Sequence, residues 1–403
     1  MPILIGGKPI VSGGYGCIFY PALKCANVKN KNNYISKLML KDKAYEESEI
    51  LKYIESNVKT INNYKNIFLI EHDEPCQPLP LKKSDLVGFD SKCNNLTKYN
   101  ISSKNINDNL NQLAIINEPY AGFDIEKYFE KKGRVFNKTD LKKFNKSVVY
   151  IIKNGILQLI KNNLYHFDLK DNNIIMKKNL TFQIIDWGFA IKIKNTIPKT
   201  LYNRPLQFNM PFSNIILGDD FQIFLKDIDF NFTNNDINIV NIEKIYKKYY
   251  PYAYFLESNT HENYISMIHH YISSNGKEIN MRKTYMFLLK YNVEILLKYI
   301  ELKNSRIIFN REKYIKNVYL NNADIFGLLT VYYSMVDIKY KFPLLSNKYI
   351  NKIKKLIGKY IYSTDYAVKK YNITNIISDI NSIIKSKGTR KDRKYKNKTK
   401  KYY

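Results

Sequence analysis

The segment from His166 to Gly188, HFDLKDNNIIMKKNLTFQIIDWG, constrains the fold of this chain more than any other stretch. Two short apolar runs, NIIM and FQII, flank the turn sequence KKNL, and this pattern predicts a β-hairpin. The hairpin would bring Asn173 and Asp186 side by side. Their amide and carboxylate oxygens are hard ligands, which Mg²⁺ prefers, and they leave other positions on the metal for ATP phosphates. The segment therefore predicts a magnesium site.

Two further polar residues precede the hairpin. Asp168 would face an acceptor hydroxyl as its base, and Lys170 would project toward the transferred γ-phosphate and offset the charge that develops there. The residues therefore indicate phosphoryl transfer. Because Asp and Asn are also common in turns, the rest of the chain must supply matching elements in the right order.

The segment resembles the catalytic loop and the magnesium-binding motif of the protein kinase superfamily, H-R-D-L-K-x-x-N followed by D-F-G. Phe167 stands in place of the Arg, and Trp187 stands in place of the Phe. That arginine usually pairs with a phosphate on the activation loop, so we expect an enzyme that does not need this phosphorylation. The aromatic change at Trp187 should still fill an apolar pocket.

The N-terminal sequence VSGGYGCIF predicts a hairpin whose backbone approaches phosphates closely, and it is similar to the kinase glycine-rich loop. Val11 stands where the first glycine of that loop would be, which should stiffen the loop. The resemblance implies that four residues contact the nucleotide: Gly13, Gly14, Gly16 and Ile18.

The next two elements are similar to the kinase strand and helix that share an ion pair. The apolar strand YISKLM carries Lys37, in the manner of the lysine that contacts the α- and β-phosphates. The following pattern, AYEESEILKYI, predicts a helix with Ile50, Leu51 and Ile54 on one face. Glu47 on this helix is the expected partner of Lys37, although Glu46 and Glu49 are close enough to compete. The short separation implies an abbreviated connection.

The sequence LAIINEPYAGFDIEKYF predicts a strand, a loop and a helix start, similar to the hinge between the two kinase lobes. Asn117 would then be the gatekeeper. Glu118 and Tyr120 would offer backbone hydrogen bonds to adenine, and Asp124 would reach the ribose. The run VVYIIKNGILQLIKNNLYHFD has helical apolar spacing and leads to His166.

These motifs, taken in order, imply an α+β, bilobal protein-kinase-like fold. A small β-rich N-lobe with one main helix is expected over residues 1–118, and a larger helical C-lobe over residues 119–384. A polar, Asn-rich stretch at about 73–110 is expected to be an insertion in the N-lobe. A mostly helical stretch at about 218–318 is expected to be a long insertion in the C-lobe.

The C-terminal part adds one polar residue and a basic tail. The sequence NADIFGLLTVYYSMV predicts a buried helix, whose Asp324 either anchors the catalytic-loop backbone, as in kinases, or caps the helix. Residues 385–403 form the tail. Its stretch from Lys385 to Lys401 has ten Lys or Arg residues, one Asp and too few apolar residues to fold around, which predicts disorder.

Composition limits the remaining possibilities. The net charge of +29 invites nucleic-acid or acidic protein partners, above all for the tail, although AT-rich coding explains much of the lysine content. There is no run of about 18 apolar residues, so we expect no membrane span and an intracellular protein. Four cysteines without a CxxC pair fit reduced thiols better than disulfides or a zinc site: Cys17, Cys25, Cys76 and Cys93.

The sequences GGYGCIFYPALKC, ISKLM and QFNMPFSNIIL, with the basic tail, resemble serine/threonine kinases of large nucleocytoplasmic DNA viruses. This resemblance implies phosphate transfer from ATP to Ser or Thr hydroxyls of proteins, with Mg²⁺ or in its place Mn²⁺, in the host cytoplasm or in the virion. A small-molecule kinase of the aminoglycoside or choline type is the alternative, although Lys170 and the glycine-rich loop favour the protein kinase. A kinase-like scaffold and a nucleic-acid-binding module remain further alternatives.

Overall fold

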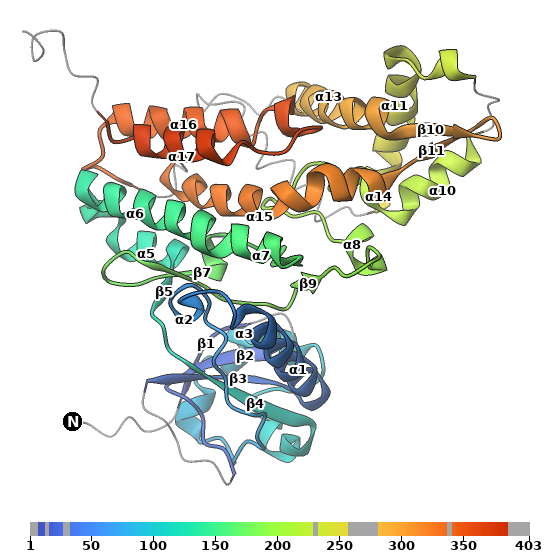
Figure 1. Cartoon of the computed structure of the whole chain (residues 1–403). Helices are drawn as coiled ribbons and strands as arrows, with labels where there is room; N and C mark the ends of the chain where they lie inside the picture. The colour runs from blue at the N-terminus through green and yellow to red at the C-terminus, as the bar shows by residue number, and fades with distance from the viewer. Residues whose placement is uncertain are drawn as a thin grey trace, which may run out of the picture. The chain divides into compact units, whose positions relative to one another are not determined.

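The computed structural model describes residues 7–12, 16–26, 33–228, 233–256, 281–336 and 341–385. The chain is a mixed α+β protein, with a small antiparallel sheet near the N-terminus and a larger helical part (Figure 1). Its residues divide into two compact units. Unit 1 consists of Met1–Asp124, Asn173–Lys177 and Phe182–Lys192, and unit 2 consists of Ile125–Asn172, Lys178–Thr181 and Ile193–Tyr403.

Unit 1 is built on a four-stranded antiparallel sheet in the order β1-β2-β3-β4. Its strands are β1 (Lys8–Ser12), β2 (Gly16–Tyr20), β3 (Tyr34–Leu40) and β4 (Leu113–Pro119). The expected N-terminal strand pair is therefore present as β1 and β2, whereas Gly13 and Gly14 lie outside the described residues. Because side chains alternate along a strand, Lys37 and Met39 share one face of β3, and Ser36 and Leu38 share the other.

The helix α1 (Lys41–Val58) follows β3 directly and packs on the Lys37 face of the sheet. Its buried residues recur every three or four positions, as an amphipathic helix requires: Ala44, Ser48, Leu51, Ile54 and Val58. The prediction that Ile50 shares this face is wrong, since Ile50 is 37% exposed. One residue of helix rotates a side chain by about 100°, which is enough to turn Ile50 outward.

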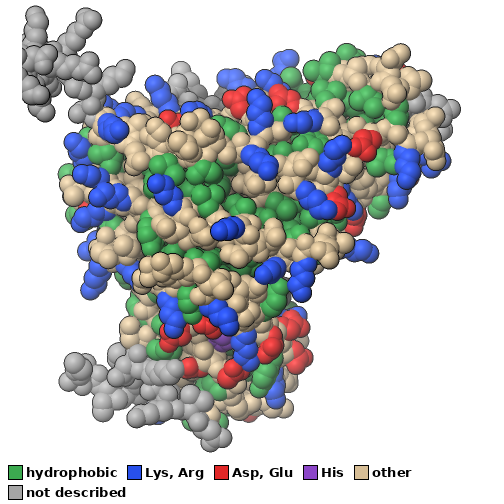
Figure 2. All heavy atoms as spheres, viewed as in Figure 1, with side chains coloured by type: hydrophobic (Ala, Val, Ile, Leu, Met, Phe, Trp, Pro, Cys, Tyr) green, Lys and Arg blue, Asp and Glu red, His purple; other side chains and the backbone are tan. Residues whose placement is uncertain are grey.

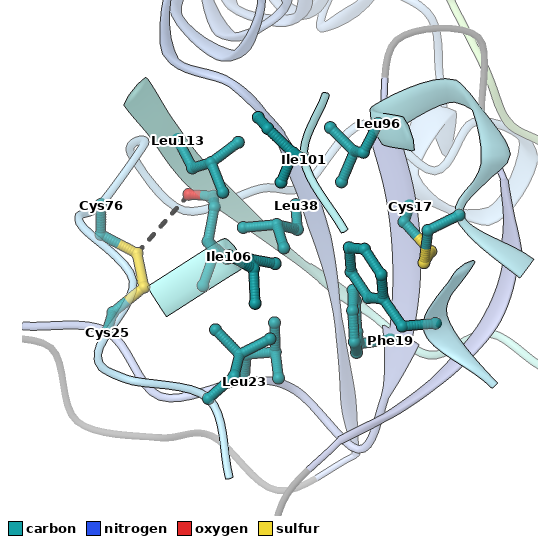
Figure 3. Close-up of a cluster of buried hydrophobic side chains, with 14 residues drawn as sticks. Cys17, Phe19, Leu23, Cys25, Leu38, Cys76, Leu96, Ile101, Ile106 and Leu113 are labelled. Atoms are coloured by element: carbon teal, nitrogen blue, oxygen red, sulfur yellow. Dashed lines mark hydrogen bonds between the residues drawn. A yellow bond between two sulfur atoms is a disulfide. The ribbon is translucent and has the colours of Figure 1, made fainter. Parts of the chain in front are cut away.

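The opposite face of the sheet is covered by the segment that we expected to be an insertion. This segment contains short helical turns rather than a structureless loop: Lys83–Leu86, α3 (Phe89–Lys92), α4 (Asn94–Thr97), Ile106–Asp108 and Leu110–Gln112. Leu96, Ile101 and Ile106 from it pack against Phe19 and Leu38 from the sheet (Figure 3). The Asn-rich segment therefore contributes buried side chains to the hydrophobic core of unit 1.

Two disulfides join this segment to the sheet side of unit 1, so the prediction of reduced thiols is wrong. Cys17 is bonded to Cys93 and Cys25 to Cys76, with Cα–Cα distances of 5.1 and 5.8 Å, both within the range that a disulfide needs. The absence of a CxxC pair argues only against a disulfide between cysteines that are close in the sequence. Here the fold brings together cysteines that are 76 and 51 residues apart.

The predicted hairpin in the opening segment is confirmed. The strands β7 (Ile174–Met176) and β8 (Phe182–Ile184) pair antiparallel, with Ile174 opposite Ile184, and β5 (Phe123–Asp124) pairs with β7. Unit 1 also contains α2 (Tyr64–Ile67) and β9 (Ile191–Lys192).

Unit 2 is mostly helical, and several of its longer helices pack against one another. The expected helix before His166 runs as α6 (Lys138–Tyr150), a π-helical turn (Ile151–Ile156) and α7 (Leu157–Lys161), and a capping box of Asn137 and Asp140 starts it. Figure 1 shows α6, α15, α16 and α17 side by side. The remaining bounds of this core are α5 (Ile125–Lys132), Gly133–Val135, β6 (Leu164–Tyr165), α14 (Arg311–Tyr314), Ile315–Tyr319, α15 (Leu320–Leu329), Thr330–Met335, α16 (Asn347–Tyr360), Thr364–Tyr366 and α17 (Ile373–Ser382).

The region that we expected to be a helical insertion is mostly helical where the structure describes it. Two short helices precede it, α8 (Lys199–Tyr202) and α9 (Asn214–Leu217). The region itself contains α10 (Asp219–Asp227), Asn234–Asp236, α11 (Ile239–Leu256) and α13 (Met281–Tyr299). After α13 it contains a hairpin that we did not expect, β10 (Ile300–Lys303) with β11 (Arg306–Phe309). Asn304 and Ser305 both have positive φ, 51° and 60°, as a tight hairpin turn requires.

No helix among the described residues combines the length and the apolar character that crossing a bilayer would require.

Candidate functional site

The polar residues predicted from the sequence fall into two groups, one within each unit. The first group, which we call the lysine cluster, lies in unit 1 and consists of Lys37, Glu47, Glu118 and Asp186. The second group, the Asp168 cluster, lies in unit 2, in the loop that the sequence predicts to be catalytic.

The predicted ion pair forms in the lysine cluster. The Lys37 Nζ lies 2.5 and 2.7 Å from the two carboxylate oxygens of Glu47, and both side chains are less than one-fifth exposed. The helix α1 starts immediately after β3, so no loop separates the strand of Lys37 from the helix of Glu47. This contiguity explains how a separation of 10 residues suffices.

Three carboxylates act on this one ammonium group. Burial alone would lower the pKa of Lys37, but attraction from Glu47, Asp186 and Glu118 outweighs it and raises the pKa above the ordinary value. Burial raises the pKa of Glu118 to about 7, against the opposing effect of Lys37. The cluster therefore has more negative than positive charge, which suits a site that takes up a cation.

Asn173 and Asp186 lie at the same end of the β7–β8 hairpin, where the Ile185 N–H donates to the Asn173 carbonyl at 3.0 Å. Asp186 has a φ of 62°, a left-handed conformation that is costly for a non-glycine residue and is concentrated at functional sites. The described residues contain no group of three or more His, Cys, Asp or Glu side chains that could hold a metal by themselves. The amide and carboxylate oxygens of Asn173 and Asp186 nevertheless fit Mg²⁺ that takes its other ligands from phosphates and water.

Trp187 fills an apolar pocket, as predicted. It is 1% exposed and meets the ring of Phe68 edge-on, with ring centroids 5.2 Å apart. Packing of this kind stabilises an aromatic pair beyond the area that it buries. The side chain that follows Asp186 is thus a core residue of unit 1.

Of the residues proposed to contact the nucleotide in the glycine-rich loop, the structure describes Gly16 and Ile18, both in β2. Ile18 pairs with Lys37 across β2 and β3, so the two side chains share a face. A Cβ atom at Gly16 would overlap the carbonyl oxygen of Leu38, so only glycine fits there.

The hinge residues differ from prediction in one clear respect. The prediction that Asn117 is the gatekeeper on the nucleotide face is wrong, because it pairs with Ser36 and accepts the Ser36 Oγ hydrogen bond at 2.6 Å, on the face opposite Lys37. The side chain of Glu118 lies on the Lys37 face instead, and sequence reasoning had assigned only its backbone a role.

The other two hinge residues were assigned contacts with adenine and ribose. The Tyr120 N–H donates to the Asn33 carbonyl at 2.8 Å, so this backbone donor is already engaged within unit 1. Asp124 lies in β5 opposite Ile175 and is 9% exposed. Both assigned contacts remain predictions.

The Asp168 cluster includes Asp324, which anchors the loop backbone. One oxygen accepts the His166 N–H at 2.9 Å and the other accepts the Phe167 N–H at 2.7 Å. Asp324 lies inside α15 and is 1% exposed, so of the two predicted roles the anchor is confirmed and the helix cap is wrong. Burial raises the pKa of Asp324 despite these hydrogen bonds.

The carboxylate of Asp168 is buried and held by two donors. The Lys170 Nζ lies 3.1 and 2.9 Å from its two oxygens, and the Asn209 Nδ2 donates to Oδ1 at 2.9 Å. A carboxylate fixed in this way can accept a proton from a hydroxyl placed beside it, with a cation ready for developing negative charge.

Sequence reasoning missed two residues of this cluster, Arg204 and Asn209. Both belong to the segment NRPLQFNMPFS, of which only the second half, within QFNMPFSNIIL, entered the sequence-based prediction, as part of a family resemblance. Polar side chains in an otherwise apolar, proline-rich stretch were the available signal, but nothing local shows which loop they contact.

The predicted site residues thus form one cluster around Lys37 in unit 1 and one around Asp168 in unit 2. Lys37 and Glu47 form the one ion pair that was predicted in full, and Lys170 with Asp168 forms an ion pair that was predicted only as two roles. The functional assignment has to stand on this geometry, because comparison of the sequence with protein-family models and with curated proteins gives no match.

Proposed function

We propose that the chain is a serine/threonine protein kinase with a bilobal kinase-like arrangement, which transfers the γ-phosphoryl group of ATP to protein hydroxyls. The observation that carries the proposal is the ion pair of Lys170 with Asp168 in a loop anchored by Asp324. A lysine at this position favours the protein kinase over a small-molecule kinase. The intact Lys37–Glu47 pair argues against an inactive scaffold.

In the proposed reaction, each of the two clusters has its own role. Lys37, fixed by Glu47, binds the α- and β-phosphates, and Asn173 with Asp186 would hold Mg²⁺, which neutralises phosphate charge when bound. The acceptor hydroxyl oxygen forms a bond to the γ-phosphorus while the bond to the β–γ bridging oxygen breaks. The hydroxyl proton passes to Asp168, Lys170 offsets charge on the transferred group, and ADP leaves.

The surface charge gives little support to a nucleic-acid-binding module as the main function. On the face shown in Figure 2, Lys and Arg side chains are interspersed with other side chains and do not form a single continuous patch. We propose that the basic tail contacts nucleic acid or acidic proteins as an accessory to phosphoryl transfer.

The first test is transfer from radiolabelled Mg·ATP to casein, to a basic protein and to an aminoglycoside. We expect label on Ser or Thr, and loss of turnover by several orders of magnitude in Asp168→Asn with ATP binding retained, because Asp168 acts mainly in the reacting state. Asp227→Asn, an exposed aspartate of unit 2, is the matched control. Label on the aminoglycoside alone would refute the protein kinase in favour of the small-molecule enzyme.

A further inference from the structure

Three consecutive residues of the catalytic loop are each held by a side chain from one distant segment. The segment is residues 203–213, and its side chains Arg204 and Asn209 reach Phe167, Asp168 and Leu169. All of these residues belong to unit 2, so the contacts lie within one compact body.

Arg204 holds the residue that stands in place of the kinase loop arginine. Its Nη2 donates to the Phe167 carbonyl at 3.0 Å, and its guanidinium carbon lies 5.1 Å from the centroid of the Phe167 ring. Phe167 has a φ of 57°, a strained conformation that surrounding contacts must maintain. The arginine absent from the loop is thus replaced in space by one that comes from the segment.

The charge of Arg204 is directed at the catalytic loop. The residue is 9% exposed, and a buried cation persists only where opposite charge and hydrogen bonds compensate it. Burial lowers the pKa of Arg204, and its interactions with Tyr319, Asp168 and Asp324 oppose this shift. Two of these three groups are the reacting carboxylate and the loop anchor.

Asn209 holds the reacting carboxylate itself. Its amide nitrogen donates to Asp168 Oδ1 at 2.9 Å and to the Leu169 carbonyl at 3.1 Å, and the residue is 1% exposed. One amide therefore joins the side chain and the backbone of the loop, which restricts the rotation of the Asp168 carboxylate.

The loop is fixed from the helix side as well. Asp324 accepts the backbone N–H groups of His166 and Phe167, and Gly327 on the same helix lets the Leu169 and Asn209 carbonyls approach closely. A Cβ atom at Gly327 would lie 2.6 Å from the Leu169 oxygen and 3.1 Å from the Asn209 oxygen. The loop is therefore held between α15 and the segment.

We propose that Arg204 and Asn209 are positioning residues that latch segment 203–213 onto the catalytic loop and hold Asp168 without phosphorylation of that segment or of the residues just before it. The proposal rests on the kinase function proposed above and specifies how its active conformation is maintained. In a kinase with an arginine in the loop, a phosphate is needed to neutralise that charge and order the segment. Here the segment supplies the arginine, and the negative charges are already present in the fold.

The test uses the full chain with Mg·ATP and casein. The variants are Arg204→Met, Asn209→Leu and the conservative Arg204→Lys, and Arg306→Met, at an exposed arginine of unit 2, is the matched control. Since misplacement of a reacting group by about 1 Å costs on the order of 100-fold in rate, we expect Arg204→Met and Asn209→Leu to lower kcat by about that factor. The KM for ATP should stay within about twofold, because neither residue is among those proposed to bind the nucleotide, and Arg204→Lys should recover part of kcat.

Phosphatase treatment of the wild type, and alanine at the exposed Thr196 and Thr200, should leave kcat unchanged. Full kcat in Arg204→Met and Asn209→Leu, or loss of wild-type activity after phosphatase treatment, would overturn the latch.

Hydrogen exchange separates failure of the latch from failure of the kinase proposal. Arg204→Met should exchange faster than wild type in residues 166–171 and 203–213, whatever the reaction turns out to be. If Arg204→Met exchanges faster than wild type and the wild type labels no acceptor, the kinase proposal is refuted and the latch stands as a structural device. Unchanged exchange in Arg204→Met and in the milder Arg204→Lys refutes the latch even if the kinase is active.

Discussion

The two disulfides predict a large and specific loss of stability on reduction, confined to unit 1. They are nested, since the Cys17–Cys93 bond encloses the Cys25–Cys76 bond along the chain. With the inner bond intact, breaking the outer one reopens an effective loop of only about 25 residues, and the chain-entropy model gives about 3.5 kcal/mol for it. The inner bond closes a loop that spans 51 residues, for which the same model gives about 4 kcal/mol.

Loss of both bonds should therefore cost about 7 to 8 kcal/mol, which is comparable to the whole stability of a typical domain of about 5 to 15 kcal/mol. We expect Cys17→Ala/Cys93→Ala to leave unit 1 folded and less stable. Full reduction should bring unit 1 to the edge of unfolding. Alanine is the better replacement because both positions are 0% exposed, and serine would bury a hydroxyl.

Trp187 makes the assay selective for unit 1. It is the one tryptophan of the chain, and it is buried against Phe68 within unit 1. Urea unfolding followed by its fluorescence should show a midpoint about 2 M lower for the double alanine variant, for a slope of about 2 kcal/mol per M. Reduced wild type is the control that keeps all four sulfurs and removes only the cross-links.

The reasoning would be refuted if oxidised and reduced wild type unfolded at the same midpoint. Quantitative alkylation in denaturant, without prior reduction, should then label four free thiols, and the original expectation of reduced cysteines would hold in solution. Labelling of none is the expected result.

Three further predictions concern charge. Because the pKa of Glu118 is raised from 4.5 to about 7 in the folded state, its contribution to stability is fully present below pH 4.5 and is lost as the pH rises through about 7. The Trp187 unfolding midpoint should fall over this range in wild type and stay flatter in Glu118→Gln, and identical profiles would contradict the assignment. Asp324→Asn replaces one of two acceptors with a donor facing a backbone N–H, so unit 2 should lose about 2 to 4 kcal/mol, read from helical circular dichroism in urea. Asp227→Asn is its control, and an unchanged midpoint would show that the anchor is dispensable. Truncation after Lys385 should weaken binding to a DNA or acidic-peptide probe, with less effect at high salt, and should leave phosphorylation of a neutral peptide intact. Tail-dependent binding that ignores salt would exclude the electrostatic explanation.

The features that sequence predicted correctly depend on contacts between neighbours in the chain. The β7–β8 hairpin needs only two apolar runs and a turn, and the Lys37–Glu47 pair needs only a strand that continues directly into a helix. The helix before His166 was likewise visible in its apolar spacing. In each case the spacing along the chain already determines which side chains can meet.

The features that sequence missed depend on register and on long-range contacts. The face of Asn117 is decided by its pairing with Ser36, 81 residues away, and a shift of one residue would have put it beside Lys37. The disulfides and the contacts of Arg204 and Asn209 join segments 37 to 76 residues apart. No local pattern distinguishes such partners from other polar residues of the same type.

Gly327 limits which side chains α15 can carry beside the loop of Asp168. Its hydrogen occupies the space where any other residue would push a carbon into the Leu169 carbonyl, so every substitution transmits its bulk directly to the loop beside Asp168. Substitutions at neighbouring apolar positions of α15 can be absorbed by side-chain repacking, whereas here the obstructing atom is backbone. In a saturation scan this position should tolerate as little change as Asp168 itself, although it lies on a helix that carries no reacting group.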